Sequence, residues 1–149
     1  MTLTVVSLFD ESGNMGRPWA EKGAKVICYD LLNEATVENF KSGGSLERYR
    51  CNLSTDWVIR RIAEVYKPDI IFGFPPCTDL AVSGAAHFAS KRIKDANFQI
   101  NAVTLARQVE KLGQLTGAPW FAENPVSVLA SMWRAPDHRF HPFEYGGYL

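Results

Sequence analysis

Short segments rich in β-favouring residues, the first of them a continuous run, recur along the chain and predict the strands of a sheet. Each run is four to eight residues long and rich in β-favouring side chains, and the third is the weakest. Runs of this kind are typical of strands that are covered on both faces of a parallel sheet. The predicted strands are residues 3–9, 24–29, 46–53, 69–74 and 119–122.

Amphipathic segments between these runs predict helices, because their apolar residues are three and four positions apart. The expected helices are a short one that carries Trp19 and Ala20 and ends at Gly23, a second from the N-cap Ser54 through Val58, Ile62 and Val65 to Lys67-Pro68, and a long one from about Arg92 to Gly117. A loop is expected around Ser83-Gly84-Ala85-Ala86, and the last two dozen residues show no clear period.

The alternation of strand and helix favours one α/β domain with a doubly wound, mostly parallel sheet. Ligands of such sheets bind beyond the carboxyl ends of the strands. Asp10, Asp30, Cys77 and Glu123 each follow a predicted strand directly. We therefore expect these four side chains to line one crevice.

Composition narrows the class of protein further. Sixteen basic and sixteen acidic residues cancel, so a nucleic acid would have to bind through a local basic patch. No stretch approaches the roughly 20 apolar residues of a membrane helix, and no signal peptide is recognisable, which indicates a cytoplasmic protein. Three scattered cysteines make neither a disulfide framework nor a metal-ligand set, so no metal is expected.

Cys77 is the cysteine whose position suggests chemistry. Cys28 and Cys51 lie in or near predicted strands and are expected to be packing residues. Cys77 follows two prolines in a polar loop, where a thiol is positioned rather than buried. Glu123 leaves two interpretations open: a carboxylate that caps a turn, or a partly buried acid with a pKa raised by desolvation.

The turn after the first predicted strand suggests a nucleotide site. Gly13 and Gly16 are a fragment of a nucleotide-binding fingerprint. Asp30 lies seventeen residues beyond Gly13, close to where an acid that binds a ribose hydroxyl is expected. Together these residues favour an adenosine-containing ligand.

Three motifs, taken together, resemble a known family. Phe-Gly-Phe-Pro-Pro-Cys-Thr at 72–78 resembles the catalytic Pro-Pro-Cys motif of the DNA cytosine-C5 methyltransferases. Glu123-Asn124-Pro125 resembles that family's Glu-Asn-Val element, and residues 7–13 resemble its first, cofactor-binding motif. In its shortness and in its tail, residues 133–142, the chain is most similar to the small methylase-like proteins of bacteriophages.

The resemblance implies a Rossmann-like S-adenosylmethionine-dependent methyltransferase fold over residues 1–149, without a recognisable target-recognition domain beyond a remnant at 126–149. It implies that Cys77 adds to a flipped cytosine of DNA, that Glu123 acts at the ring nitrogen N3, and that S-adenosyl-L-methionine supplies the methyl group. The implied cofactor-binding residues are Phe9, Asp10, Ser12, Gly13, Asp30, Asn52 and Pro75. The implied substrate-binding residues are Pro76, Asn124, Lys91, Arg92, Arg134 and His138.

Departures from the family leave two alternatives open. The arginine-rich motif, the long target-recognition region and the C-terminal cofactor segment of that family are not recognisable, so a homo-oligomer or a partner chain would have to supply them. The first alternative is a catalytically degenerate methylase-like module that binds DNA or a host protein. The second is an unrelated Rossmann-like protein whose Pro-Pro-Cys is coincidental and which binds a nucleotide or dinucleotide instead of S-adenosylmethionine.

Overall fold

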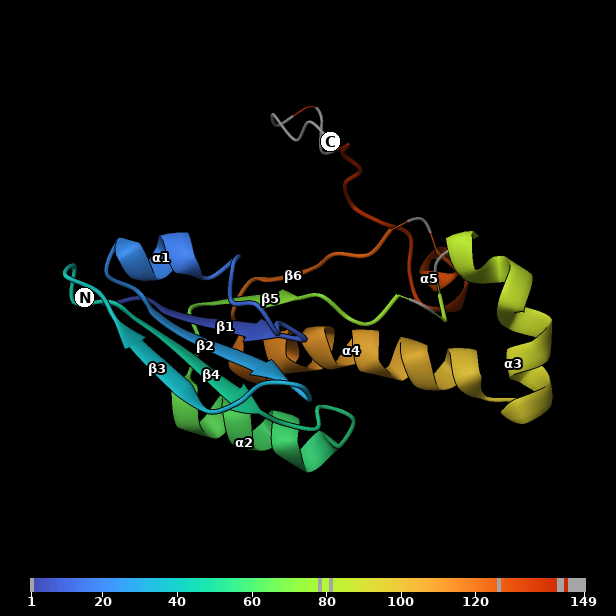
Figure 1. The fold of residues 1–149 in the computed structure, drawn as a ribbon, viewed down its shortest axis with the longest axis horizontal. Coiled ribbons are helices and arrows are strands. Elements are labelled where there is room, and N and C mark those ends of the chain that lie inside the picture. Colours follow the sequence, from blue (N-terminus) through green and yellow to red (C-terminus); the bar gives the residue numbers. More distant parts are fainter. Residues whose placement is uncertain (1, 78, 81, 126, 142–143, 145–149) are drawn as a thin grey trace.

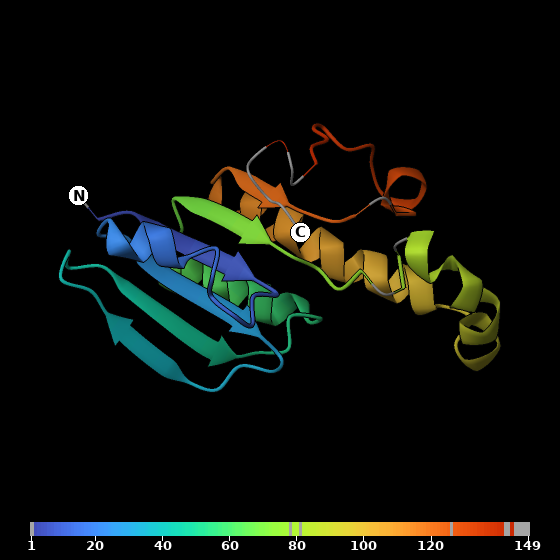
Figure 2. The ribbon, with the colours of Figure 1, turned by 45° about the horizontal axis from the view of Figure 1, so that its top comes forward.

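The protein is a six-stranded sheet with helices on both faces. The computed structural model describes residues 2–77, 79–80, 82–125, 127–141 and 144. Within these residues the strand order is β3-β4-β2-β1-β5-β6, and only β3 runs antiparallel to its neighbour (Figure 2). The strands are β1 Thr4–Leu8, β2 Lys25–Asp30, β3 Thr36–Asn39, β4 Ser45–Arg50, β5 Ile70–Gly73 and β6 Trp120–Ala122.

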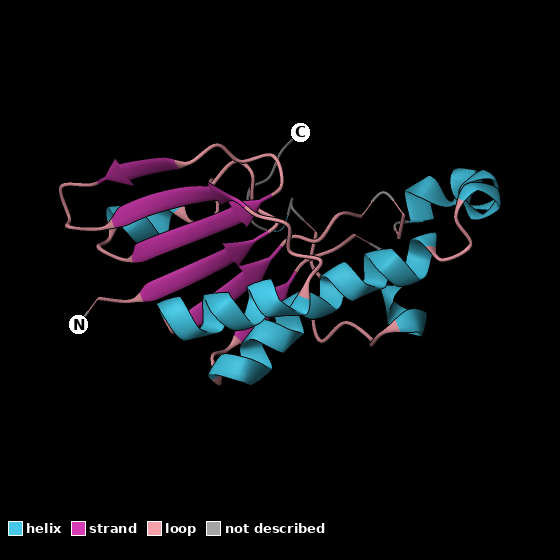
Figure 3. Ribbon diagram, turned by 90° about the horizontal axis from the view of Figure 1, so that it is seen from below, coloured by secondary structure: helices cyan, strands magenta, loops and turns pink. Residues whose placement is uncertain are grey.

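Two of the helices cover one face of the sheet and a short helix covers part of the other. Figures 1 and 3 show α2 and α4 lying together against one face, while α1 lies on the opposite face. Beyond the sheet, a 3-10 segment and α3 form an arm at the far end of α4. The helical segments are α1 Arg17–Glu21, α2 Asp56–Tyr66, η1 Val82–His87, α3 Phe88–Lys94, α4 Phe98–Thr116 and α5 Leu129–Met132.

The central strand β1 is buried on both faces, as its continuous apolar run predicts. Val6 and Leu8 pack with Ile59 of α2 and Val109 of α4. Val5, on the other face, packs in a second cluster with Ala20 of α1. The alternation of the β1 side chains between two cores explains why the successive residues Val5 and Val6 are both apolar.

The boundaries of α2 differ slightly from the prediction. Thr55, with an extended backbone, occupies the N-cap position, because the Ser54 hydroxyl instead donates a hydrogen bond of 2.7 Å to Asn52 Oδ1. Val65 faces solvent, so the prediction that it belongs to the buried face is wrong, whereas Ile62 is buried. The helix ends at Lys67, whose φ of 44° places it in the left-handed region.

Three segments were not predicted: β3, the helical turns at 82–94, and α5 in the tail that shows no clear period. β3 pairs with β4 as an antiparallel hairpin, but all four of its residues are exposed, so no apolar pattern marks it. Helical turns at 82–94 replace the expected loop, and the long helix begins at Phe98 rather than near Arg92. α3 has no buried residue, which explains why the hydrophobic pattern does not reveal it.

The coarse fold prediction is confirmed: the sheet is mostly parallel, with Rossmann-like topology. When its parallel strands are numbered along the chain, their order β4-β2-β1-β5-β6 reads 3-2-1-4-5, the first five positions of the dinucleotide-binding order. No helix in the described part of the chain combines the length and apolar character needed to cross a bilayer.

Candidate functional site

A cleft of about 660 Å³ lies beyond the carboxyl end of β1. This is the edge of a doubly wound sheet where ligands bind. Its walls combine two aromatic rings, two carboxylates and one guanidinium. The lining residues are Phe9, Asp10, Glu11, Ser12, Asn14, Met15, Arg48 and Phe74.

The loop between β1 and α1 has the backbone of a nucleotide-binding turn. Gly13 has a φ of 72°, which a glycine adopts without strain. Gly16 lies so close to β2 that an added Cβ would stand 2.5 Å from Val26 Cγ1. In the fingerprint Gly-x-Gly-x-x-Gly, the second glycine lets the backbone approach a ligand and the third allows close helix–strand packing. Gly13 and Gly16 occupy these two places, and Glu11 occupies the first.

Phe9 carries the strain of this loop. Its φ of 58° is unusual for a bulky residue, and it lines the cleft. The neighbouring Asp10 donates its backbone N–H to the Tyr29 carbonyl at 3.1 Å, which anchors the strained turn to β2. Backbone strain that the surrounding structure maintains is found preferentially at functional sites.

The Asp10 carboxylate organises the floor of the cleft from a buried position. It accepts hydrogen bonds from the Ser7 hydroxyl at 2.8 Å and from the Gly13 N–H at 2.7 Å. The Cys28 thiol donates to the same carboxylate at 3.7 Å. Burial, reinforced by the Asp10 charge, raises the pKa of Cys28 well above its ordinary value, so this thiol stays protonated.

Asn33, which is fully buried, ties three segments together behind the cleft. Its amide donates to the Asp10 carbonyl at 3.2 Å and to the Cys28 carbonyl at 3.4 Å. The Arg48 guanidinium donates to Asn33 Oδ1 at 3.3 Å and to the Glu11 carbonyl. Arg50 Nε donates to the Asn33 carbonyl at 3.2 Å. The wall of the cleft is thus fixed by hydrogen bonds from β4.

Asp30 stands at the carboxyl end of β2, as predicted. Its Oδ1 accepts a hydrogen bond of 2.8 Å from the Leu32 N–H. Leu31 and Leu32 beside it are 62% and 67% exposed, which is unusual for two adjacent leucines. An acid at the end of the second strand is the place where such sheets bind a ribose.

A second group of predicted residues gathers at the ends of β5 and β6. The Glu123 N–H donates to the Gly73 carbonyl at 3.0 Å, and Asn124 Nδ2 donates to the Pro75 carbonyl at 3.3 Å. Cys77 is half-buried, whereas Glu123 and Pro76 are exposed. None of these residues lines the 660 Å³ cleft, so of the four expected in one crevice only Asp10 does. Thr78 lies outside the described residues.

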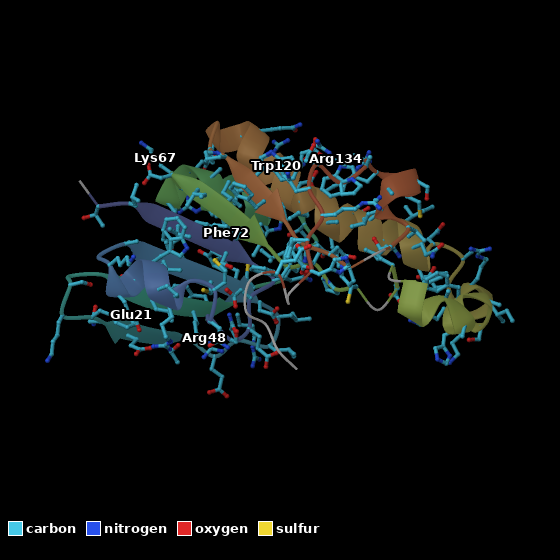
Figure 4. All side chains as sticks on the ribbon, turned by 90° about the horizontal axis from the view of Figure 1, so that it is seen from above. Glu21, Arg48, Lys67, Phe72, Trp120 and Arg134 are labelled. Atoms are coloured by element: carbon cyan, nitrogen blue, oxygen red, sulfur yellow. The ribbon has the colours of Figure 1, made fainter. Side chains whose placement is uncertain are left out.

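The predicted substrate-binding side chains are dispersed. Lys91 forms an ion pair of 2.5 Å with Asp79, and Arg92 is exposed on the arm. Figure 4 shows Arg134 beside Trp120; its guanidinium lies 5.5 Å from the ring centroid. His138 is exposed, and neither it nor Arg134 lines the cleft.

Asn52, expected near the cofactor, instead closes a local turn. Its Oδ1 accepts hydrogen bonds from the backbone N–H and the hydroxyl of Ser54 at 3.0 and 2.7 Å. Asn52 does not line the cleft. No group of three or more His, Cys, Asp or Glu side chains in the described residues could hold a metal ion.

The sequence interpretation missed several residues of the cleft. Phe74 was assigned to a strand, and Arg48 lay in the weakest predicted strand, where its long side chain gave no sign of reaching another loop. Asn33 follows Asp30 in an irregular segment, and only its buried polar amide reveals its role. The available signal was the charge of Arg48 within a predicted strand whose neighbour in the sheet ends at the acid Asp30. The missed residues are Glu11, Asn14, Met15, Asn33, Arg48 and Phe74.

Comparisons with solved structures find the same fold in larger enzymes. The chain is similar to an epimerase from Methanothermobacter thermautotrophicus, with 18% identity and a TM-score of 0.52, over 80% of this chain and 34% of that one. It is less similar to a UDP-glucose 4-epimerase from Thermotoga maritima with bound UDP-glucose, with 20% identity and a TM-score of 0.44, over 74% and 35% of the two chains. An enzyme from Bordetella bronchiseptica in complex with NAD⁺ matches at 14% identity and a TM-score of 0.41, over 76% and 37%.

The chain therefore spans about a third of the length of these neighbours. No protein-family model and no curated protein matches the sequence. The likeness to the first epimerase shows the Rossmann-like fold.

These findings contradict the methyltransferase interpretation. The neighbour with a TM-score of 0.52 is an epimerase and not a cytosine methyltransferase. The assignments to DNA cytosine-C5 methyl transfer, to S-adenosyl-L-methionine as cofactor and to a degenerate methylase that binds DNA or a host protein are wrong. The physical reason is that the motifs are short and serve the fold: two prolines end β5, and Asn124 ties the turn after β6 to Pro75. The chain has the sheet and the strand-end cleft of the Rossmann-like fold.

Proposed function

We propose that this chain binds an adenosine-containing ligand in the cleft beyond β1. The observation that carries the proposal is the geometry of the β1–α1 loop. Gly16 packs against Val26 so closely that no side chain fits, and Gly13 takes a left-handed conformation beside a cleft of about 660 Å³. These are two of the three glycine roles in a dinucleotide-binding turn.

The surroundings of this loop suit the two parts of an adenosine. Phe9 and Phe74 offer aromatic surface on which a base can stack. Asp30 lies outside the cleft lining, at the end of β2 next to the exposed Leu31 and Leu32, where its carboxylate can accept hydrogen bonds from the ribose hydroxyls of a ligand that extends beyond the cleft. An apolar surface with a few convergent polar groups is the usual composition of a small-molecule site.

Epimerase activity is not part of the proposal. The chain spans 34% of the epimerase from M. thermautotrophicus, and a likeness at 18% identity extends to the fold alone. The proposed function is therefore binding, by a chain with the strand order of a nucleotide-binding domain.

Isothermal titration with adenosine and NAD⁺, with guanosine as the contrast, tests the proposal. Adenosine should bind more tightly than guanosine and raise the melting temperature. Asp30→Asn should weaken adenosine binding about tenfold, because a charge-assisted hydrogen bond to the ribose is lost.

Asp137→Asn is the matched control, since Asp137 belongs to the C-terminal segment, where it pairs with Arg134, and not to a strand end. The proposal is overturned if neither adenosine nor NAD⁺ binds, or if the Asp30 and Asp137 variants bind adenosine equally well.

A further inference from the structure

The lining of the cleft carries more negative than positive charge, and this imbalance affects which adenosine ligand the cleft can bind. We infer that Glu11 is a specificity-determining residue, which makes the cleft prefer an adenosine ligand whose tail carries no net negative charge over one that carries a pyrophosphate. The inference rests on the proposed adenosine site and names the charge class of its ligand.

Glu11 stands where a phosphate-binding turn has a glycine. In the fingerprint Gly-x-Gly-x-x-Gly the first glycine makes the tight turn and carries no side chain, and the second lets the backbone approach the pyrophosphate. Here Gly13 and Gly16 keep two of the three places, and the first is a glutamate that lines the cleft. A pyrophosphate at this turn would approach a carboxylate instead of bare backbone.

No residue that the structure describes neutralises the Glu11 carboxylate. The side chain is exposed, and among the described residues no donor or cation pairs with it. Like charges at about 4 Å repel by about 1 kcal/mol in bulk water, and by more beside a protein surface. The unpaired charge is therefore available to act on a ligand.

Arg48, the one cation among the lining residues, balances only one of the two lining carboxylates, Asp10 and Glu11, and so leaves the lining with one excess negative charge. Its guanidinium donates to the Glu11 carbonyl and to Asn33 Oδ1, so it braces the wall of the cleft. Turning it toward a phosphate would break both bonds and leave the Oδ1 of the fully buried Asn33 without this donor.

Asp10 adds a second negative charge on the floor of the cleft. Its carboxylate is held by donors from below, namely Ser7, Gly13 and Cys28, of which only the Gly13 N–H belongs to the turn. That N–H, which in the fingerprint turn would face the pyrophosphate, is therefore already used. The turn keeps its glycine geometry but does not offer a phosphate this donor.

Titrations with adenosine, ADP and NAD⁺ against the wild-type chain, Glu11→Gln and Glu21→Gln test the inference. The wild type should bind adenosine at least about tenfold more tightly than ADP, which corresponds to about 1.4 kcal/mol. Glu11→Gln should strengthen binding of ADP and NAD⁺ about three- to tenfold and leave adenosine binding within about twofold. Glu21, at the end of α1, lies outside the cleft lining, so Glu21→Gln removes the same charge without this effect.

Raising the salt concentration should narrow the difference between adenosine and ADP for the wild type, because the repulsion is exposed to solvent. Equal binding of adenosine and ADP, or no response of ADP binding to Glu11→Gln, would overturn the inference while the adenosine site stands. Failure of adenosine itself to bind overturns the proposed site and the inference together.

Discussion

The buried side chain of Asn33 makes several of the hydrogen bonds that hold the wall of the cleft. Its amide donates to carbonyls of the β1–α1 loop and of β2, and its Oδ1 accepts from Arg48 of β4. A buried amide with these partners contributes to stability mainly because its loss leaves other buried groups unpaired. The cleft and the folded state therefore depend on the same residue.

Asn33→Ala should lower the free energy of unfolding by about 2–4 kcal/mol, because it removes the amide donor to the Asp10 carbonyl and one of the two acceptors of the Arg48 guanidinium. Urea denaturation followed by circular dichroism measures the change. Asn39→Ala, in the exposed strand β3, is the control and should change stability by no more than about 0.5 kcal/mol. Equal effects of the two substitutions would show that the hydrogen bonds of Asn33 do not stabilise the fold.

At the residue scale, the sequence predicts which residues lie at strand ends better than it predicts which of them contact one another. Asp10, Asp30, Cys77 and Glu123 all follow strands, as the apolar pattern indicates, because a strand end is set by local sequence. Which of them share a cleft depends on how loops fold back over the sheet edge. Arg48 lines the cleft because its side chain spans from β4 to Glu11, a connection between residues 37 positions apart that no local pattern contains.

At the scale of elements, α1 and β2 can lie in close contact because Gly16, at the start of α1, has no side chain. Val26 fills the space that a Cβ on Gly16 would need, and both residues belong to the region around α1 that carries the turn of the cleft. The packing of this short helix is thus coupled to the shape of the β1–α1 loop.

Gly16→Ala should destabilise the protein by about 1–3 kcal/mol, because the new methyl group overlaps Val26. In the double variant with Val26→Ala the space is restored. Its loss of stability should therefore be smaller than the sum of the losses in the two single variants, with a coupling of about 0.5–3 kcal/mol. Chemical denaturation of the two single variants and the double variant gives the coupling. Strict additivity would show that helix α1 moves away freely, and that its close approach to β2 is not required.

The elements that were missed share one physical property. The strand β3 is exposed at all four residues, and α3 buries none, so neither leaves a hydrophobic period in the sequence. The strands β1, β2 and β5 and the helices α2 and α4 were found because burial imposes such a period. Hydrogen bonding to β4 creates β3, and that pairing is visible only in the assembled sheet.

At the scale of the whole molecule, burial is concentrated in the sheet and its two long helices. The arm formed by η1 and α3 lies beyond the end of the sheet, joined to the body through α4 (Figures 1 and 2). Segments with few buried apolar contacts open locally with low free energies.

Amide hydrogen exchange should therefore be slow in the sheet and fast in the arm. Amides of β1 and β2 should exchange at least about 100-fold more slowly than those of α3, and α2, with Ile59 and Ile62 buried, serves as a helical control with intermediate or strong protection. Exchange measured by mass spectrometry on peptides covering each segment gives the comparison. Protection of α3 equal to that of α2 would mean that the arm is held by contacts beyond those of this chain's folded body.

The two edges of the sheet also differ, and this difference bears on solubility. The β3 edge carries Glu38, paired with Arg17, on a fully exposed strand, and charge at an edge discourages pairing with another chain. The β6 edge presents Phe121, which is 53% exposed and stacked on Phe72. With no net charge at neutral pH, the molecule has little electrostatic repulsion between copies. Aggregation of this protein should therefore begin at β6, and a lysine placed there would be the first substitution to try in making a concentrated solution stable.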